Sequence, residues 1–423
     1  MTSPLVPEKR AARARRVLRE LAQEGRLELS PQPVVYGGNR VHLLVNGEQF
    51  FPVLLTAIEN ATRSIHMETY IFADDGIGHR VADALAAAAG RGVAVQLLID
   101  GYGGGDYARR LVKELGQHGA QVRIFRPERW WRLERKLLRR LHRKIAVFDD
   151  ALAFVGGINV IDDFTEVRFD PSGRRGPRFD FAVQCEGPIV AAMALAVKRL
   201  WWTLSVVRPT EIAGRLPRLA RQPRPAPYPD GAAAALLLRD NLRHRRTIER
   251  AYLDAIQGAR DEILIANAYF LPGRRFRTAL REAAARGVRV RLLLQGRVEY
   301  TLQHFAQRVL YGQLLDAGVH IHEYLPSFLH AKVAVVDARW STVGSSNIDP
   351  YSLLLAREAN IVVFGHGFAS ELRSVLERAI DNDSYALRPE DYRSRRWWRR
   401  GADWIAYGLL RFATVVLARG KDY

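Results

Sequence analysis

Cysteine is almost absent from this sequence, because Cys185 is the single one among 423 residues. A chain with one cysteine can form neither an intrachain disulfide nor a metal site built from several thiolates, which fits a reducing compartment. Long apolar runs are missing as well. No stretch reaches the ~18 uninterrupted apolar residues of a membrane-spanning helix, and the N-terminal stretch MTSPLVPEKRAARARRVLRELAQEGR has no apolar core of the kind found in a cleaved signal peptide.

Negative charge is in short supply. The chain has 64 Lys and Arg against 45 Asp and Glu, a formal net charge of +19. Its 48% hydrophobic and 26% charged content is ordinary for a folded protein, so extensive disorder is not expected. A large positive excess raises the local concentration of polyanions and so predicts an anionic partner, either nucleic acid or an acidic membrane surface.

Two parts of the chain resemble each other. AIENATRSIHMETYIF (57–72) is similar to AIQGARDEILIANAYF (255–270), and RGVAVQLLIDG (91–101) is similar to RGVRVRLLLQG (286–296). In both parts the pattern indicates helix, strand, helix and strand, followed by a shared histidine-containing hairpin. The sequence therefore predicts an α/β fold in which one unit is present twice.

The joint between the two units is expected in the proline- and arginine-rich stretch 208–231, which cannot sustain a buried element. We place the boundary at about residue 220. The predicted organisation is a basic N-terminal extension (1–35), a first lobe (36–219), a second lobe (220–390) and a basic amphipathic C-terminal segment (391–423).

Two basic segments also carry many aromatic and aliphatic residues. ERWWRLERKLLRRL is inserted before His142 in the first half only, and the chain ends with RSRRWWRRGADWIAYGLLRFATVVLARG. Tryptophan and leucine interleaved with arginine are typical of a helix that lies flat at a lipid surface. The alternative for each segment is a helix packed on its own domain with a solvated basic face.

The hairpin motif has the same spacing in both halves. LHRKIAVFDDALAFVGGIN (141–159) and FLHAKVAVVDARWSTVGSSN (328–347) each contain HxKxxxxD followed by G-[GS]-x-N. In a strand, side chains two residues apart share a face, so the sequence places His142 beside Lys144 and His330 beside Lys332. One such motif is weak evidence, but two copies with identical spacing in homologous halves indicate a shared chemical purpose.

The residues after each motif offer neutral phosphate-binding groups. Asn159 and Asn347 both follow their histidine by 17 positions and supply amide donors. Gly157 precedes the first asparagine and permits close approach of the backbone to a ligand, and Ser345 takes its place in the second copy.

Four carboxylates accompany the motifs. Asp149 and Asp337 complete the HxKxxxxD pattern in the turn after each strand, where we expect them to accept backbone hydrogen bonds. Asp180 and Glu358 each precede an apolar strand and could orient the imidazoles, although they lie 38 and 28 residues beyond the histidine of their own half.

This set of groups matches the needs of phosphodiester exchange. Two ammonium groups and amide donors can stabilise negative charge on the nonbridging oxygens. One neutral histidine can attack phosphorus to form a phosphohistidine, while the other, protonated, gives its proton to the departing alkoxide. In the second step the roles reverse, which histidine allows because its pKa of about 6.5 makes both forms accessible. No metal or other cofactor is required.

The paired motif resembles that of the phospholipase D superfamily. VNGEQFFPVLLTAIENA, LIDGYG, ANAYFLPG and TVGSSNIDPYSLLLARE are further similar to bacterial cardiolipin synthases, the B type in particular, over residues 36 to 400. The resemblance implies one site at the interface of two lobes related by a pseudo-twofold axis. It also implies that the histidines and lysines are catalytic, with His142 the nucleophile and His330 the acid and then base; the residues themselves do not set this order.

The resemblance also implies a reaction and a location. One phosphatidylglycerol would transfer its phosphatidyl group to another, giving cardiolipin and glycerol, on an anionic phospholipid membrane at the cytoplasmic face of the bacterial inner membrane. The expected attachment is peripheral, with no nucleic acid or protein partner. The alternatives are phosphatidylethanolamine as donor, a phospholipase D-type hydrolase or nuclease, and a noncatalytic module that binds membrane or nucleic acid through its charge.

Overall fold

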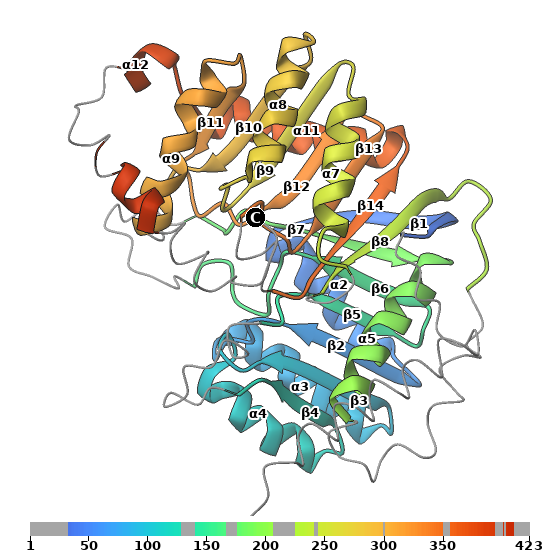
Figure 1. The fold of residues 1–423 in the computed structure, drawn as a ribbon. Helices are drawn as coiled ribbons and strands as arrows, with labels where there is room; N and C mark the ends of the chain where they lie inside the picture. Colours follow the sequence, from blue (N-terminus) through green and yellow to red (C-terminus); the bar gives the residue numbers. More distant parts are fainter. Residues whose placement is uncertain are drawn as a thin grey trace, which may run out of the picture.

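The structure is a computed structural model and describes residues 33–127, 140–165, 176–205, 225–240, 244–298, 301–349, 356–393, 401 and 403–409. It contains two lobes (Figure 1). The first lobe comprises β1 (Val35–Val45), α2 (Asn46–Asn60), β2 (Ser64–Thr69), α3 (Gly76–Gly90), β3 (Ala94–Asp100), α4 (Gly105–Gln117), β4 (Gln121–Phe125), β5 (Ile145–Phe148), β6 (Leu152–Gly156), β7 (Phe181–Glu186) and α5 (Ile189–Ser205).

The second lobe repeats this series. It comprises β8 (Ala232–Arg239), α7 (Thr247–Gly258), β9 (Glu262–Asn267), α8 (Arg274–Ala285), β10 (Arg289–Gln295), α9 (Thr301–Leu315), β11 (His320–Tyr324), β12 (Lys332–Val336), β13 (Trp340–Gly344), β14 (Glu358–Phe364), α11 (His366–Asp383), β15 (Ser384–Ala386) and α12 (Pro389–Arg393).

The strands follow the same spatial order in both lobes. The first lobe has the order β1-β7-β6-β5-β2-β3-β4, and the second has β8-β14-β13-β12-β9-β10-β11, with β15 added at its edge. In each lobe the three strands before the motif are parallel and the others antiparallel. The predicted α/β unit present twice is therefore confirmed.

The two lobes share one sheet and one core. Antiparallel pairing of β1 with β8 joins them into a sheet of 15 strands. Strands β13 and β14 also pack against β6 and β7, and one core cluster combines aliphatic side chains of both lobes, those of α5 and α11 included. Helices α2 to α4 cover the outer face of one lobe and α7 to α9 that of the other (Figure 1). This common core fixes the position of one motif relative to the other.

The sequence explains these elements through burial. The strands EILIAN of β9, IAVF of β5 and KVAVV of β12 are buried at every position, so near-continuous apolar runs suit them. Helix α8 instead buries one stripe, made of Phe276, Ala279, Leu280 and Ala283, at the spacing of an amphipathic helix.

One part of the predicted order was incomplete. A third helix and strand stand before each hairpin, α4 with β4 and α9 with β11. The compared segments ended at residues 101 and 296, and the strands beyond them, QVRIF and HIHEY, are short and partly polar because they lie toward the edges of the sheet.

Several predicted segments lie outside the described residues. These are nearly all of the N-terminal extension, residues 128–139 of the basic insertion before His142, and residues 206–224, which contain the predicted lobe boundary. Of the C-terminal basic segment, residues 391–393, 401 and 403–409 are described, and residues 403–409 form a helix beside α9 (Figure 1). Among the helices that are described, none combines the length and the apolar character needed to cross a membrane.

Candidate active site

Both motif histidines lie just before a strand, so the expectation that they lie inside one was wrong. The strands begin three residues after His142 and two after His330. The backbone N–H of His142 donates to the carbonyl of Arg357 at 2.9 Å, and that of His330 donates to the carbonyl of Phe179 at 2.8 Å. Each motif therefore begins with a backbone bridge to the other lobe rather than with a continuation of its own strand.

The residue before each histidine is held by a polar side chain at the end of a parallel strand. The N–H of Leu141 donates to Asp100 Oδ2 at 2.8 Å, and the N–H of Leu329 donates to Gln295 Oε1 at 3.2 Å. Asp100 ends β3 and Gln295 ends β10, so equivalent positions of the two lobes perform the same task.

The imidazoles are paired with carboxylates of the opposite lobe. His142 Nδ1 lies 3.0 Å from Glu358 Oε2, and His330 Nδ1 lies 2.6 Å from Asp180 Oδ2. Counting each carboxylate from the histidine of its own half was therefore wrong. Asp180 and Glu358 stand next to Phe179 and Arg357, the residues that make the backbone bridges, and so the same crossing places both backbone and side chain.

These contacts set the free face of each ring. A ring whose Nδ1 carries the proton donated to a carboxylate leaves Nε2 with a lone pair for reaction. The side chains of His142 and His330 are both 16% exposed, whereas those of Asp180 and Glu358 are almost fully covered. The imidazoles are thus the part of the two pairs that a substrate can reach.

The two motif lysines fold back on their histidines. Lys144 Nζ donates to the carbonyl of His142 at 2.8 Å, and Lys332 Nζ donates to the carbonyl of His330. Both lysines are buried. Burial, together with repulsion from Lys332, lowers the pKa of Lys144 to about 7, although Glu358 opposes the shift.

Burial and positive charge keep both imidazoles neutral. The pKa of His142 is lowered by burial and by Lys144 and Lys332, against the attraction of Glu358. The pKa of His330 is held well below its usual value by burial and by surrounding cations, among them Lys332 and Lys144. Since each histidine feels the lysine of the other lobe, the two motifs form one electrostatic site.

Asp180 is ionised at neutral pH in spite of its position. Burial raises its pKa to about 6, while the charges of Lys332 and Lys144 and a 2.8 Å hydrogen bond from the N–H of Phe181 oppose that rise. At pH 7 the pair therefore consists of an Asp180 carboxylate and a neutral His330. A phosphate anion bound beside the rings would raise the pKa of both imidazoles.

The predicted phosphate-binding residues are buried beside the motifs. Asn159 Oδ1 accepts the N–H of Ile71 at 3.1 Å, which leaves the amide NH₂ group to act as the donor. Asn347 lies after β13, at the position equivalent to Asn159 after β6. Ser345 Oγ donates to Glu358 Oε2 at 2.5 Å, so its hydroxyl holds the carboxylate that holds His142.

The difference between Gly157 and Ser345 has a steric cause. A Cβ atom on Gly157 would collide with the carboxylate of Asp180, the partner of His330. The shorter aspartate side chain of one pair occupies the space that the serine side chain fills in the other.

Asp149 and Asp337 have a structural task, as their position in the turn predicted. Asp149 accepts the backbone N–H groups of Thr62, Arg63 and Ser64 at 2.7 to 2.9 Å. Asp337 accepts the three equivalent N–H groups of residues 260–262 at 2.8 to 2.9 Å. Each carboxylate thus ties the motif hairpin to the start of a parallel strand, and neither hydrogen-bonds to the histidines or lysines of the motif.

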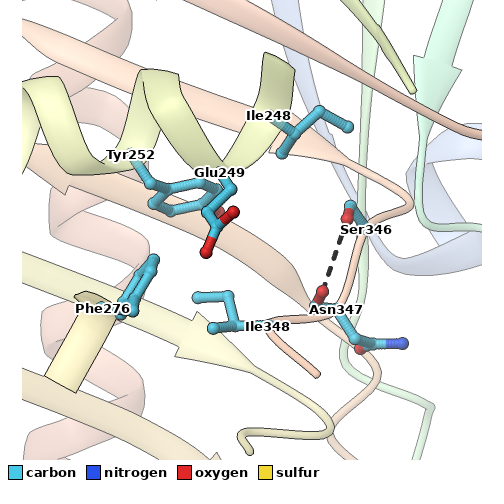
Figure 2. Close-up of a pocket in the computed structure, with 7 residues that line it drawn as sticks. All are labelled: Ile248, Glu249, Tyr252, Phe276, Ser346, Asn347 and Ile348. Atoms are coloured by element: carbon cyan, nitrogen blue, oxygen red, sulfur yellow. Dashed lines mark hydrogen bonds between the residues drawn. The ribbon is translucent and has the colours of Figure 1, made fainter. Parts of the chain in front are cut away.

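One small pocket lies beside the second phosphate-binding asparagine. Figure 2 shows the side-chain amide of Asn347 pointing away from it. Apolar side chains line most of the pocket, and neither histidine does; its lining consists of Ile248, Glu249, Tyr252, Phe276, Ser346, Asn347 and Ile348. The pocket therefore adjoins Asn347 and is not lined by either histidine.

Tyr70 is a site residue that the sequence analysis missed. Its ring packs edge-on against His142 with centroids 4.9 Å apart, and Lys144 Nζ lies 5.4 Å from its ring centre. The equivalent residue in the second lobe is Ala268, from the alignment of METYIF with IANAYF. The presence of tyrosine in one segment and alanine in the other was the only sign in the sequence that Tyr70 belongs to the site. Because of this difference, the two histidines have different surroundings.

A second missed feature is a buried ion pair in the first lobe. Arg143 Nε and Nη2 donate to Glu68 Oε2 and Oε1 at 2.7 and 2.8 Å. The equivalent residues of the second lobe are Ala331 and Ala266. Such a pair is costly to break from one side, because the remaining charge stays buried. It anchors the residue between His142 and Lys144 to β2.

The arrangement can carry a phosphoryl-type group between two acceptors. Two neutral imidazoles and two buried lysines interact at one place, supplied equally by two lobes, and a buried asparagine follows each hairpin. The cations favour an anion between the rings, and either ring can accept the proton that the other loses.

Comparison with known proteins agrees with this geometry. The model of a family described as cardiolipin synthase, PLD-like domain, matches residues 54–168 and 252–380, one match in each lobe. The chain is 39% identical to cardiolipin synthase B of Escherichia coli (strain K12) over 375 residues, 88% of each chain. It is 33% identical to cardiolipin synthase A of Pseudomonas fluorescens (strain SBW25) over 342 residues, 80% of this chain and 68% of the relative.

A solved structure has the same fold. The phosphatidylserine synthase of Haemophilus influenzae Rd KW20 superposes with a TM-score of 0.67 at 14% identity, covering 95% of this chain and 99% of that one. At this identity the likeness concerns the fold alone.

Replacing Asp337 with asparagine should lower stability without changing the chemistry. The carboxylate accepts three backbone N–H groups, so we expect a loss of about 1–3 kcal/mol in the free energy of unfolding at pH 7. Those hydrogen bonds outweigh burial and lower the pKa of Asp337, so its stabilisation is present above the usual pKa and disappears as pH falls through the lowered value. Denaturant unfolding at several pH values measures this, with Asp254→Asn, at an exposed position of α7, as control. Turnover per folded Asp337→Asn molecule should equal wild type, and a large loss of turnover would contradict the structural assignment.

Gly157→Ser should impair the site, although the second copy of the motif has a serine, Ser345, at the equivalent position. The added side chain would displace Asp180 from His330, and loss of such a supporting contact costs about ten- to a hundredfold in activity. We expect kcat/KM to fall by that factor. Gly90→Ser, at an open position in α3, is the control. Unchanged kcat/KM in Gly157→Ser would show that the Asp180 contact is dispensable.

Proposed function

The chain belongs to the family of cardiolipin synthases with phospholipase D-like domains, and we propose that it is a cardiolipin synthase, a phosphatidyltransferase that joins two phosphatidylglycerols into cardiolipin and releases glycerol. The observation that carries the proposal is the pair of imidazoles held by carboxylates of the opposite lobes, with both motif lysines buried beside them. Such a set can hold one substrate phosphorus between two histidines.

The first half-reaction transfers the phosphatidyl group to the enzyme. The Nε2 atom of His142 attacks phosphorus, and the bond from phosphorus to the glycerol oxygen breaks. His330, protonated once the anionic substrate is bound, gives its proton to that oxygen, so glycerol leaves uncharged. The ammonium groups of Lys144 and Lys332 and the amide of Asn159 stabilise the nonbridging oxygens as phosphorus becomes five-coordinate.

The second half-reaction uses the same groups in reverse. The headgroup hydroxyl of a second phosphatidylglycerol gives its proton to His330, now neutral, and its oxygen attacks phosphorus while the bond to His142 breaks. The acceptor must therefore approach from the side that glycerol left. One phosphodiester replaces another, so the reaction has little driving force, and the supply of lipid and removal of product set its direction.

The enzyme works where its lipid substrates are. We place it peripherally at the cytoplasmic face of the bacterial inner membrane. Its relatives are bacterial, and a net charge of +19 favours a surface rich in anionic lipid. Attachment of this kind weakens as salt screens the charges.

The direct test uses purified protein and phosphatidylglycerol vesicles, with the lipid products resolved by mass. We expect cardiolipin and glycerol from the wild-type protein and neither from His142→Ala or His330→Ala, because each half-reaction needs both rings. Wild-type product that is phosphatidic acid alone would make water the acceptor and the protein a hydrolase. Absence of any lipid product, with nicking of plasmid DNA in parallel, would make it a nuclease.

The value of kcat/KM should fall as pH rises, because that parameter reports the free enzyme and the first half-reaction needs one proton on the pair of His330 and Asp180. Burial raises the pKa of Asp180 to about 6, so the pair loses this proton as pH rises through that value. Loss of the proton from Lys144, whose pKa is about 7, makes the fall steeper. In Lys144→Arg the guanidinium stays charged, so the fall at high pH should be less steep even though activity is reduced. An equally steep fall in both proteins would remove Lys144 from this role.

A further inference from the structure

The helix formed by residues 403–409 has its polarity reversed relative to an ordinary surface helix. Its acidic residue, Asp403, is 2% exposed, and Ala406 is 6% exposed. Its largest apolar side chains face outward: Trp404 is 58% exposed, Ile405 66% and Leu409 55%. A surface helix normally directs its polar side chains to water and its apolar ones to the core. This arrangement therefore suits a helix whose outer side meets something other than water.

The exposed residues form one continuous face. At 100° per residue, Trp404, Ile405 and Leu409 fall within a single arc of the helix. Gly401 and Gly408 fall between them, are also exposed and have open space where a Cβ would be. Every described residue on this arc is therefore apolar or glycine, with no charge to keep it hydrated. We call Trp404, Ile405 and Leu409 the apolar face.

The opposite side of the helix is fixed to the body of the protein. Ala406 packs with Ala306 and Leu310 of α9 and with Leu271, and Tyr407 packs against the same cluster. The ring of Trp404 meets that of Tyr407 edge-on at 5.9 Å between centroids. The apolar face is thus held outward by packing of the other side and is not free to turn inward without losing it.

A short chain of contacts connects this helix to the reaction centre. Leu271, which packs against Ala406, donates its N–H to the carbonyl of Ile348 at 2.8 Å. Ile348 follows Asn347 directly, and Asn347 is one of the proposed phosphate-binding residues. The helix is therefore linked through Leu271 to the segment that carries Asn347. Leu302, one turn before Ala306 on α9, is also exposed.

We propose that the apolar face inserts into the interfacial layer of an anionic phospholipid bilayer and so positions the active site against the lipid headgroups. This rests on the proposed function, because a protein that transfers phosphatidyl groups must reach phosphates at that depth. Tryptophan and tyrosine prefer the headgroup level, and leucine and isoleucine prefer the acyl boundary below it. The net charge of +19 supplies the attraction to anionic lipid that brings the face to the surface.

The test compares two triple variants of the full chain. One is Trp404→Ser/Ile405→Ser/Leu409→Ser. The matched control is Val112→Ser/Leu195→Ser/Phe364→Ser, which removes three exposed apolar side chains from α4, α5 and the far end of β14. Binding is measured by co-sedimentation with vesicles of equal parts phosphatidylcholine and phosphatidylglycerol. The first variant loses the contacts of three apolar side chains with the bilayer, so its vesicle binding should weaken at least about tenfold. Vesicle binding by the control should equal that of wild type.

A second measurement separates this proposal from the proposed function. Turnover of monomeric short-chain phosphatidylglycerol needs the site but no bilayer, so both variants should match wild type, which also shows that they fold. If wild type transfers no phosphatidyl group, the proposed function fails while vesicle binding still decides the role of the helix. Equal vesicle binding by the first variant and wild type would overturn the proposal. So would a wild-type dimer in lipid-free sedimentation that the first variant abolishes, because the face would then be covered by a second copy.

Discussion

The hydrogen bonds that cross between the lobes, from His142 to Glu358 and from His330 to Asp180, are the constraint on which the site depends. Each lobe supplies a ring and the carboxylate that orients the other ring, so neither lobe alone contains a complete catalytic pair. The shared sheet and core hold the lobes at the required distance. Duplication of one α/β unit thus produces a site with two similar halves, which suits a reaction whose second step reverses the first.

The two halves are similar but not equivalent, and the differences lie close to the rings. Tyr70 packs on His142 where the other lobe has Ala268, and Ser345 supports Glu358 where Gly157 makes room for Asp180. His142 therefore has an aromatic neighbour and a glutamate partner. His330 has an aspartate partner, whose side chain is shorter and whose oxygen lies closer to the ring. The donor lipid needs a nucleophile, and the acceptor lipid needs a base. Two rings with different surroundings can take these different roles.

Much of this could be predicted from the sequence, for physical reasons. The repeat, the α/β class and the identity of the motif residues follow from local patterns that recur at fixed spacing, and the backbone-binding task of Asp149 follows from its place in a turn. The crossing of the carboxylates could not be predicted, because spacing along a chain carries no information about which lobe a side chain faces. The position of His142 before its strand could not be predicted for the same reason, because its backbone partner is Arg357 of the other lobe. The buried pair of Arg143 and Glu68 was hidden because a charged residue in an apolar strand has no periodic signature.

The central claim is that the crossed pair of histidines carries the phosphatidyl group, and the most direct measurement is to trap it there. Wild-type protein mixed with phosphatidylglycerol and quenched within one turnover should carry a phosphatidyl group on a single peptide containing His142 or His330, identified by mass spectrometry of acid-labile adducts. The adduct should disappear when a second phosphatidylglycerol is allowed to react, with cardiolipin formed in equal amount. Cardiolipin formation without any histidine adduct at times shorter than one turnover would contradict the account.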